Sequence, residues 1–526
     1  MVIREDKMGQ TWLFPPRISD LIPNDHICHL VAEIVKNVNV SNAENKYKSR
    51  PGNPAYSRRM LLRLMVMATI DGVYSSRKIS KLAHENVVYM YLTGNEKPDF
   101  RTICNFRKEN KELIKNAFEE TVAISRKLGL LKLGHLSTDG TKLKANASNS
   151  NTLSKEEIDE VKRIIDKGIE IDVEEDRLYG DAKGDELPPE LNTREKIRKK
   201  IKDIEKIRDK KLKRSAKNVI EQYAIGDENQ KRNVLAKLDK AKEEIEKSGQ
   251  KAVSLTDPEA RFMKNKKKLN ELSYNPQITV DNGSGMIVAC DVTQDCTDHE
   301  QLEPQIESTE KNLGGLPNDI KISADNGYFS GSNLQYLEKK GLEGYIPNSK
   351  QAQQMKGKKV KESPYSKDKF VYDEKTDCFI CPQGQVLTCK GVYKGNNDTT
   401  RYAYYSTGCH KCSHQVECAG KNRVKVITSL GYEAERKRMD AKMQSKEGIK
   451  EYRKRGETVE WPFGNIKQNM RFKEFMTRGI ENVKNEHNLI CMAHNFKVMW
   501  GILKGNVDII SKTKRSITGL VSSLMS

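Results

Sequence analysis

The sequence predicts an α/β protein whose central sheet is mixed, with both parallel and antiparallel strands. Residues 130–140 and 320–327 carry this prediction, because each reads as a buried strand that ends in an aspartate and a glycine turn. Between them, residues 277–281 and 286–292 are strand-like and flank an Asn-Gly-Ser-Gly turn, which is typical of an antiparallel hairpin. A carboxylate at the tip of a core strand is costly to desolvate unless a cation or donor meets it. These acids are therefore the first candidates for chemistry.

The order of the remaining elements predicts the fold more narrowly. A strand, a hairpin, a helix at about 298–312, a strand, a helix at 331–340 and a strand at 342–347 is the order of a ribonuclease-H-like sheet. The first and fourth strands of that fold are neighbours, so we expect Asp139 and Asp325 to lie side by side. A third carboxylate must then come from a helix packed against the same edge.

Changes of pattern along the chain predict that two insertions interrupt this core. Sparse apolar positions and dense charges of both signs indicate that the first insertion consists of exposed helices. The short, basic N-terminal helices resemble a helix-turn-helix bundle. The expected segments are an all-α, helix-turn-helix-like DNA-binding domain at 1–128, the first part of the core at 129–150, a helical insertion at 151–252, the second part of the core at 253–349, a cysteine-rich insertion at 350–436, and the helix of the third acid with the C-terminal helices at 437–526.

The charge balance indicates a polyanionic partner. The 526 residues carry a net charge of +20, and 32% of them are charged, a composition that favours nucleic acid as the partner. No run approaches the roughly 18 apolar residues of a membrane span, and the first residues do not resemble a signal peptide. We therefore expect a cytoplasmic protein that does not contact membranes.

Six of the eleven cysteines fall between residues 378 and 418, which indicates a metal site in a reducing compartment. Cys378-x2-Cys381 and Cys409-x2-Cys412 have the spacing of a zinc ribbon, and Cys418 follows. The simplest ligand set is Cys378, Cys381, Cys409 and Cys412, with Cys418 as a replacement for Cys378, so four of the five would bind a structural Zn²⁺. The alternative is a set of reduced thiols in an irregular insertion. The cysteines outside this cluster are expected in the core: Cys28, Cys104, Cys290, Cys296 and Cys491.

Two glutamates compete for the role of the third acid. Glu457 and Glu460 are three residues apart and would share a helix face. Pro462 predicts a helix boundary or kink near Glu460. Lys467 lies about two turns beyond Glu460, where it can reach a phosphate, and this favours Glu460. Three such acids can hold two divalent cations, Mg²⁺ or Mn²⁺, at a phosphodiester.

Basic side chains near these acids and on the N-terminal helices are the candidates for contacts with DNA. They are Arg77, Lys78, Arg107, Lys142, Lys144, Arg455, Lys467, Arg471 and Lys473.

Three motifs resemble those of the DDE transposases of bacterial insertion sequences. They are Asp-Gly-Thr-Lys-x-x-Ala-Asn-Ala-Ser at 139–148, Ala-Asp-x-Gly-Tyr at 324–328 and Val-Glu-x-x-Phe-Gly-x-Ile-Lys at 459–467. The similarity extends over nearly the whole chain and indicates the eleven-eighty-two group, which is related to families four and five. The resemblance implies that Asp139, Asp325 and Glu460 form a catalytic triad that uses Mg²⁺. Related families place an arginine four residues before the glutamate, where this chain has Gly456, and Arg455 is the candidate for its phosphate contact.

The resemblance implies a DNA transposase that cleaves at the ends of an insertion sequence and transfers the strands into target DNA. The expected partners are the terminal inverted repeats, the target DNA and a second copy of the chain in the DNA complex, in the bacterial cytoplasm at the nucleoid. Two alternatives are a catalytically inactive DNA-binding regulator derived from a transposase and a hydrolytic nuclease without strand transfer. The presence of all three acids disfavours the regulator.

Overall fold

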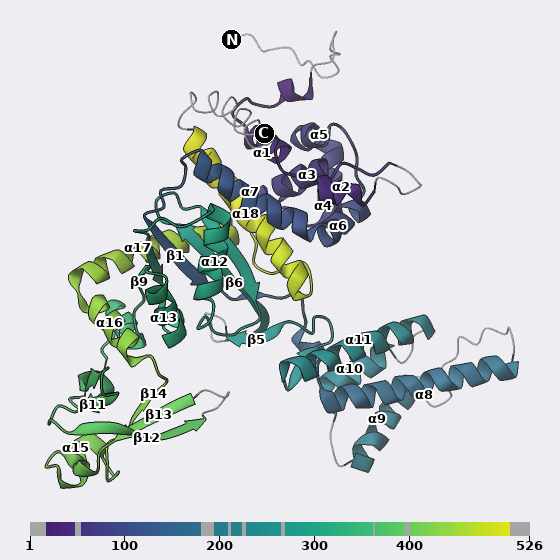
Figure 1. Cartoon of the computed structure of the whole chain (residues 1–526). Coiled ribbons are helices and arrows are strands. Elements are labelled where there is room, and N and C mark those ends of the chain that lie inside the picture. The colour runs from purple at the N-terminus through teal and green to yellow at the C-terminus, as the bar shows by residue number, and fades with distance from the viewer. Residues whose placement is uncertain are drawn as a thin grey trace, which may run out of the picture.

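The computed structural model of the chain describes residues 17–47, 54–179, 194–208, 212–223, 228–264, 269–360, 363–394 and 400–504. These residues form three hydrophobic cores. The largest core joins a bundle of helices to a seven-stranded sheet, and two smaller parts project from this body on different sides (Figure 1). The ends of the first and last predicted segments, 1–16 and 505–526, lie outside the described residues.

The part of the chain that precedes the sheet consists of helices. They are α1 (Ile27–Lys36), α2 (Ser41–Asn45), α3 (Arg58–Ile70), α4 (Ser76–Glu85), α5 (Val87–Thr93), α6 (Phe100–Glu109) and α7 (Lys111–Lys127). Side-chain caps begin α3 and α6, because Ser57 accepts the Met60 N–H and Asp99 accepts the Thr102 N–H. Helix α3 is buried nearly all round, since α1, α5 and the last described helix, α18 (Ile480–Lys504), pack against it. The two ends of the described chain therefore share one core.

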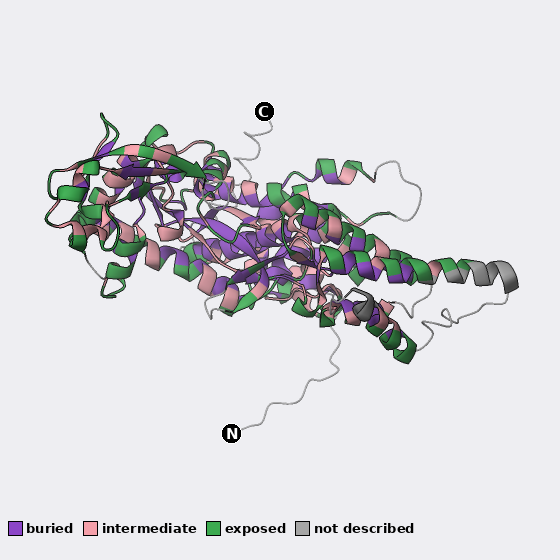
Figure 2. Cartoon of the chain, turned by 90° about the horizontal axis from the view of Figure 1, so that it is seen from below, coloured by how far each residue is buried: buried purple, intermediate pink, exposed green. Residues whose placement is uncertain are grey.

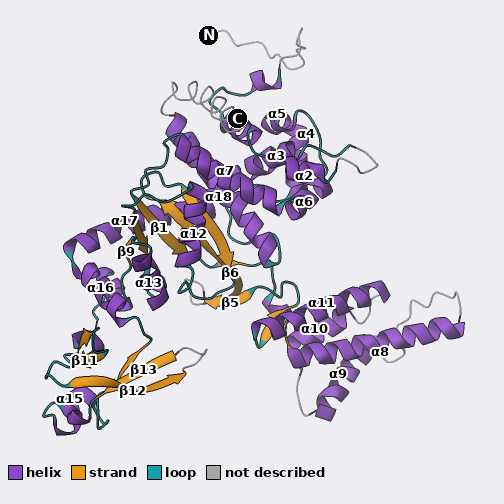
Figure 3. Cartoon of the chain, in the orientation of Figure 1, coloured by secondary structure: helices purple, strands orange, loops and turns teal. Residues whose placement is uncertain are grey.

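The central sheet is mixed, as the sequence predicts. Its strands are β1 (His135–Gly140), β2 (Leu143–Lys144), β5 (Arg261–Lys264), β6 (Asn270–Asp281), β7 (Ile287–Thr293), β8 (Lys321–Ala324) and β9 (Glu343–Tyr345). Strand β1 lies between β6, to which it is antiparallel, and β8, to which it is parallel, and β9 pairs parallel with β8. The expected adjacency of the strands that lead to Asp139 and Asp325 is confirmed, because β1 pairs with β8. Figure 3 shows β1, β6 and β9 of this sheet with helices around it.

Strand β1 begins at His135, later than the sequence predicts. Residues 130–133 form a loop because the backbone N–H groups of Lys132 and Leu133 donate to the buried Asp281 carboxylate, each at 3.0 Å, instead of to a neighbouring strand. Leu133 also has a φ of 50°, which interrupts an extended run. Strand β6 is longer than predicted, since its first half pairs with β2 and β5.

Helices α12 (Leu302–Leu313) and α17 (Lys446–Gly464) pack against this sheet. Helix α12 begins four residues later than predicted, which leaves Asp298 in the loop after β7. The boundary or kink predicted near Glu460 does not end the helix, because α17 continues through the buried Pro462 to Gly464. The helix widens only beyond the proline, in a π-helical turn at Asn465–Asn469, a feature often found at functional sites.

The two smaller parts lie at the periphery of the molecule, where Figure 2 shows mostly exposed residues. The first contains α8 (Lys155–Tyr179), α9 (Arg194–Arg208), α10 (Arg214–Tyr223) and α11 (Glu228–Ser248), and the antiparallel pair β3 (Thr152–Ser154) and β4 (Ala252–Ser254) connects it to the body. The second contains β10 (Val371–Asp373), β11 (Cys378–Ile380), β12 (Val386–Lys394), β13 (Thr400–Tyr405), β14 (Ile427–Ser429) and α15 (Gln415–Ala419). Helices α13 (Gly331–Lys339), α14 (Ser349–Met355) and α16 (Glu433–Gln444) connect this part to the sheet.

None of the helices in the described ranges is long and apolar enough to cross a membrane.

Candidate active site

Strand pairing brings Asp139 and Asp325 to the same edge of the sheet. Thr138 of β1 is paired with Ala324 of β8, so the aspartate that follows each of them lies beside the other. The Asp325 carboxylate caps a short helical turn and accepts the Gly327 N–H at 2.7 Å. Asp139 accepts the Gly140 N–H at 3.0 Å. Each carboxylate is thus oriented by the backbone of its own glycine turn.

The Asp139 carboxylate is 20% exposed and lies beside Arg455. Its pKa is raised to about 6: burial is the largest cause and the nearby carboxylates of Asp325 and Asp298 also raise it, whereas the Arg455 guanidinium lowers it. Arg455 Nη2 lies 2.8 Å from Asp139 Oδ1. A buried acid with nearby like charges is characteristic of a functional site. One arginine does not offset the cost, so the cluster favours binding of a further cation.

Asp298 belongs to this cluster, although the sequence alone placed it at a helix start. Its Oδ1 accepts hydrogen bonds from Asn275 Nδ2 at 2.7 Å and Gln277 Nε2 at 2.8 Å. Lys142 Nζ lies 3.6 Å from the same oxygen. The polar residues Asn275 and Gln277 on the buried strand β6 were the available signal, because buried amides need polar partners.

The glycines after the two aspartates leave room for these side chains. A Cβ at Gly140 would lie 2.2 Å from Gln277 Nε2 and 2.8 Å from Asp298 Oδ1. A Cβ at Gly327 would lie 2.8 Å from Asp325 Oδ1 and 3.3 Å from Asp298 Oδ2. Asp325 and Asp298 therefore approach the same point from two sides, and any larger residue at that point would displace a carboxylate.

Three basic side chains lie at the site: Arg455 on α17, Lys467 in the π-helical turn after it, and Lys142 between β1 and β2. Arg455 contacts Asp139, and Lys467 Nζ donates to Thr141 Oγ1 at 2.7 Å, just beyond the first glycine turn. Lys142 Nζ is buried and makes no hydrogen bond in the part of the chain that the structure describes. These cations surround the acidic edge, where they could meet phosphate oxygens.

Glu460 is exposed on α17, seven residues before Lys467. Glu457 is exposed as well. The structure thus sets Asp139 beside Asp325, and the third predicted acid lies on the helix that supplies Arg455, five residues beyond it.

The other predicted DNA contacts differ in exposure. Arg77 and Lys78 are exposed on α4, whereas Arg107 is half-buried and donates to the Tyr74 carbonyl at 2.9 Å. Lys144 is exposed and lies 3.1 Å from Glu474. Arg471 and Lys473 are exposed in the segment after the π-helical turn.

Four of the five candidate zinc cysteines line one small cavity of about 20 Å³: Cys381, Cys409, Cys412 and Cys418. Cys381 Sγ accepts N–H groups from Gln383 at 3.4 Å and Gln385 at 3.2 Å. Cys378 is absent from this cavity, and its Sγ lies 3.0 Å from Thr376 Oγ1. The cavity therefore favours the set that contains Cys418. The sulfurs do not converge to ligand spacing, however; in the described ranges the group that does is Cys290, His487 and Cys491.

Comparison with known protein families adds an independent line of evidence. Residues 380–500 match the family model described as a transposase DDE domain. Residues 16–109 match the model described as a transposase domain, DUF772. The first match includes Arg455, Glu460 and Lys467, and the second covers helices α1–α6. No curated protein matches the chain.

Proposed function

We propose that this chain, whose residues 380–500 and 16–109 match transposase family models, is a DDE transposase of an insertion sequence that cleaves DNA at the ends of its element and joins these ends to target DNA. Its transposase domains imply DNA as the substrate. The observation that carries the proposal is the parallel pairing of β1 with β8, which sets Asp139 beside Asp325. The DDE domain also implies a ribonuclease-H-like core, in agreement with the mixed sheet.

The acidic edge fits a pair of divalent cations. Asp139 and Asp325 offer hard oxygen ligands, which Mg²⁺ and Mn²⁺ prefer, and the raised pKa of Asp139 reflects a surplus of negative charge. Glu460 would complete the set from α17. The bound cations would activate the attacking oxygen and neutralise the leaving oxygen of the phosphodiester.

The protein's own side chains would bind and orient the DNA around this edge. Lys142, Lys467 and Arg455 would hold phosphate oxygens beside the acids. Arg455 would exchange its contact with Asp139 for one with phosphate as cations bind. Asp298 would keep Lys142, Asn275 and Gln277 in position.

The remaining parts have proposed roles in assembly. The helices within residues 1–128 would recognise the terminal inverted repeats, with Arg77 and Lys78 exposed for contact. We expect a homodimer in the DNA complex and a location in the bacterial cytoplasm at the nucleoid. Cys381, Cys409, Cys412 and Cys418 would bind a structural Zn²⁺ after a small closure of their cavity. We also propose that the remaining segments expected from the sequence, from 129–150 to 437–526, are the structural parts of the protein.

Cleavage of terminal-repeat DNA by purified protein tests this function. Asp139→Asn and Asp325→Asn should bind the repeats but not nick them with Mg²⁺, while Asp295→Asn, an exposed acid in the same loop as Asp298, should cleave normally. Nicking by Asp139→Asn at the wild-type rate would contradict the proposal. DNA binding by wild type without nicking would instead support a regulator, and nicking without joining of pre-cut ends would support a nuclease.

A further inference from the structure

A second cluster of potential metal ligands lies behind the sheet, away from the acidic edge. Cys290 is on β7, and His487 and Cys491 are four residues apart on α18, so both face the strand. The ligand atoms of the three residues all lie within 4.8 Å of one another. The expectation that Cys290 and Cys491 are ordinary core cysteines does not account for this convergence.

The imidazole of His487 is oriented as a metal ligand would be. Its Nε2 lies 3.3 Å from the Gln277 carbonyl oxygen, a geometry in which Nε2–H donates to the backbone. When Nε2–H donates to this carbonyl, Nδ1 is left as the acceptor nitrogen. Metal-binding histidines typically donate their other N–H to a carbonyl in this way. Both ring nitrogens lie close to Cys491 Sγ, Nε2 at 3.6 Å and Nδ1 at 3.9 Å.

Hydrogen bonds hold the two thiols in place. The Cys290 S–H donates to the Asn488 amide oxygen at 3.2 Å, and burial raises the pKa of Cys290, so a bound cation would have to displace this proton. Thiolate and imidazole are the ligands that zinc-like cations select.

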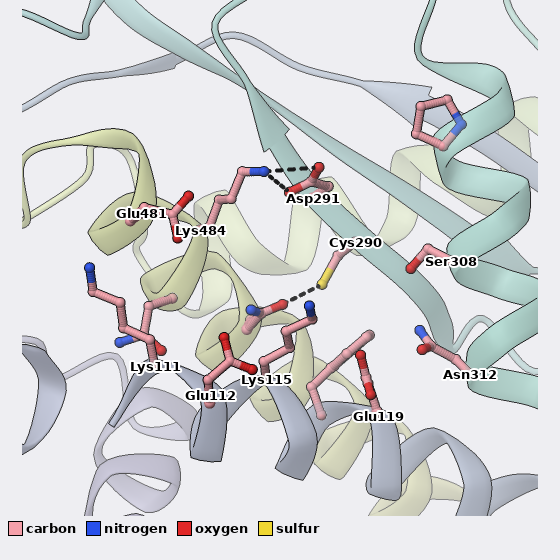
Figure 4. Close-up of a pocket in the computed structure, with 14 residues that line it drawn as sticks. Lys111, Glu112, Lys115, Glu119, Cys290, Asp291, Ser308, Asn312, Glu481 and Lys484 are labelled. Carbon is pink, nitrogen blue, oxygen red and sulfur yellow. Dashed lines mark hydrogen bonds and ion pairs between the residues drawn. The ribbon is translucent and has the colours of Figure 1, made fainter. Parts of the chain in front are cut away.

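The cluster has a route to solvent. Cys290 and Asn488 form part of the wall of a pocket of about 300 Å³ between α7, α12, α18 and β7. Figure 4 shows Cys290 facing this pocket, with Lys484 paired to Asp291 at its side. A metal ion could enter here, and water in the pocket could occupy a fourth position.

We propose that Cys290, His487 and Cys491 bind one thiophilic cation of the zinc class, with water from the pocket as the fourth ligand. The bound cation would join α18 to β7, because its ligands come from both elements. It would also fix Gln277, whose carbonyl orients His487 and whose side chain holds Asp298 at the front. This proposal does not depend on the transposase function or on zinc in the cysteine-rich part.

Metal analysis of the full-length protein tests the site. Cys290→Ser and Cys491→Ser should each contain one equivalent of zinc fewer per chain than wild type. Cys296→Ser, which changes an exposed cysteine in the nearby loop, should contain as much as wild type. Cobalt-substituted protein should lose sulfur-to-metal absorption in the same two variants. Equal zinc content in all four proteins would overturn the proposal.

Labelling of the wild-type protein provides a test that needs no variant. Maleimide modification of Cys290 and Cys491, followed by peptide mapping, should be slow with Zn²⁺ and fast after chelation. Rates that do not respond to metal, or a disulfide between the two cysteines in the isolated protein, would contradict the assignment.

Discussion

Arg455 Nη2 lies 2.8 Å from Asp139 Oδ1, so the residue that meets the first buried acid comes from the helix that also carries Glu460. This contact couples the position of α17 to the charge on the sheet edge. In the proposed function, Arg455 would contact phosphate once the acids hold cations, and Glu460 lies five residues further along the same helix. The predictions below test this coupling and the residues around it.

Replacement of Arg455 should change the pH dependence of cleavage. In Arg455→Ala the pKa of Asp139 should rise above its present value of about 6, because the favourable ion pair is lost while burial persists. The rising limb of the pH–rate profile should therefore move to higher pH, and Arg455→Lys should restore part of the shift. An unchanged profile in Arg455→Ala would show that the contact does not influence the site.

Asp139 should make the free protein less stable as pH rises from about 4 to about 6. Its pKa is raised in the folded state from 3.8 to about 6, so folding favours the protonated acid, and this contribution disappears as the acid ionises. The full shift corresponds to about 3 kcal/mol. Asp139→Asn should therefore be more stable than wild type at pH 7 and nearly equal at pH 4, as measured by urea unfolding without divalent cations. Mg²⁺ should narrow the difference at pH 7.

Asp298→Asn should reduce cleavage by about 10- to 100-fold, as expected for a partner that orients a metal site. The substitution keeps the shape of the side chain but weakens the charge that holds Lys142. The Mg²⁺ concentration needed for half-maximal cleavage should rise in Asp298→Asn, whereas Asp295→Asn should behave as wild type. Wild-type kinetics in Asp298→Asn would remove it from the site.

Glu460→Gln should abolish nicking and strand transfer, while Glu457→Gln should retain both. Both residues are exposed on α17, so neither change should lower stability by more than about 0.5 kcal/mol. Thermal unfolding serves as the folding control. The reverse outcome would assign the third acid to Glu457.

Metal binding by the cysteine-rich part should distinguish Cys378 from Cys418. Cys381→Ser and Cys418→Ser should release the metal, because both side chains line the shared cavity. Cys378→Ser should retain it, since that thiol is directed toward Thr376. Zinc content of the full-length variants measures the difference. Loss of zinc in Cys378→Ser but not in Cys418→Ser would instead support the ligand set Cys378, Cys381, Cys409 and Cys412.

The sequence predicted features that depend on local pattern. The mixed sheet and the pairing of the strands that lead to Asp139 and Asp325 followed from strand tips, turns and element order. The start of β1 did not, because Asp281, a distant side chain, binds the backbone of Lys132 and Leu133. Pro462 did not mark the end of its helix, which continues to Gly464.

Tertiary contacts define the parts of the site that the sequence left open. Asp298 joins the acids only because Asn275 and Gln277 on another strand hold it. The convergence of Cys290 with His487 and Cys491 requires a strand and a helix nearly two hundred residues apart. No short sequence motif encodes such contacts. The exposure of Glu460 likewise depends on how the whole of α17 packs.

The packing of α18 against α3, α7 and β7 has a consequence for synthesis of the protein. The ribosome must complete residues up to about Lys504 before the helical bundle and the sheet can close their shared core. Until then, the apolar faces of both remain open to aggregation and proteolysis. A chain that stops before Ile480 would lack the helix that closes this core and should not fold stably.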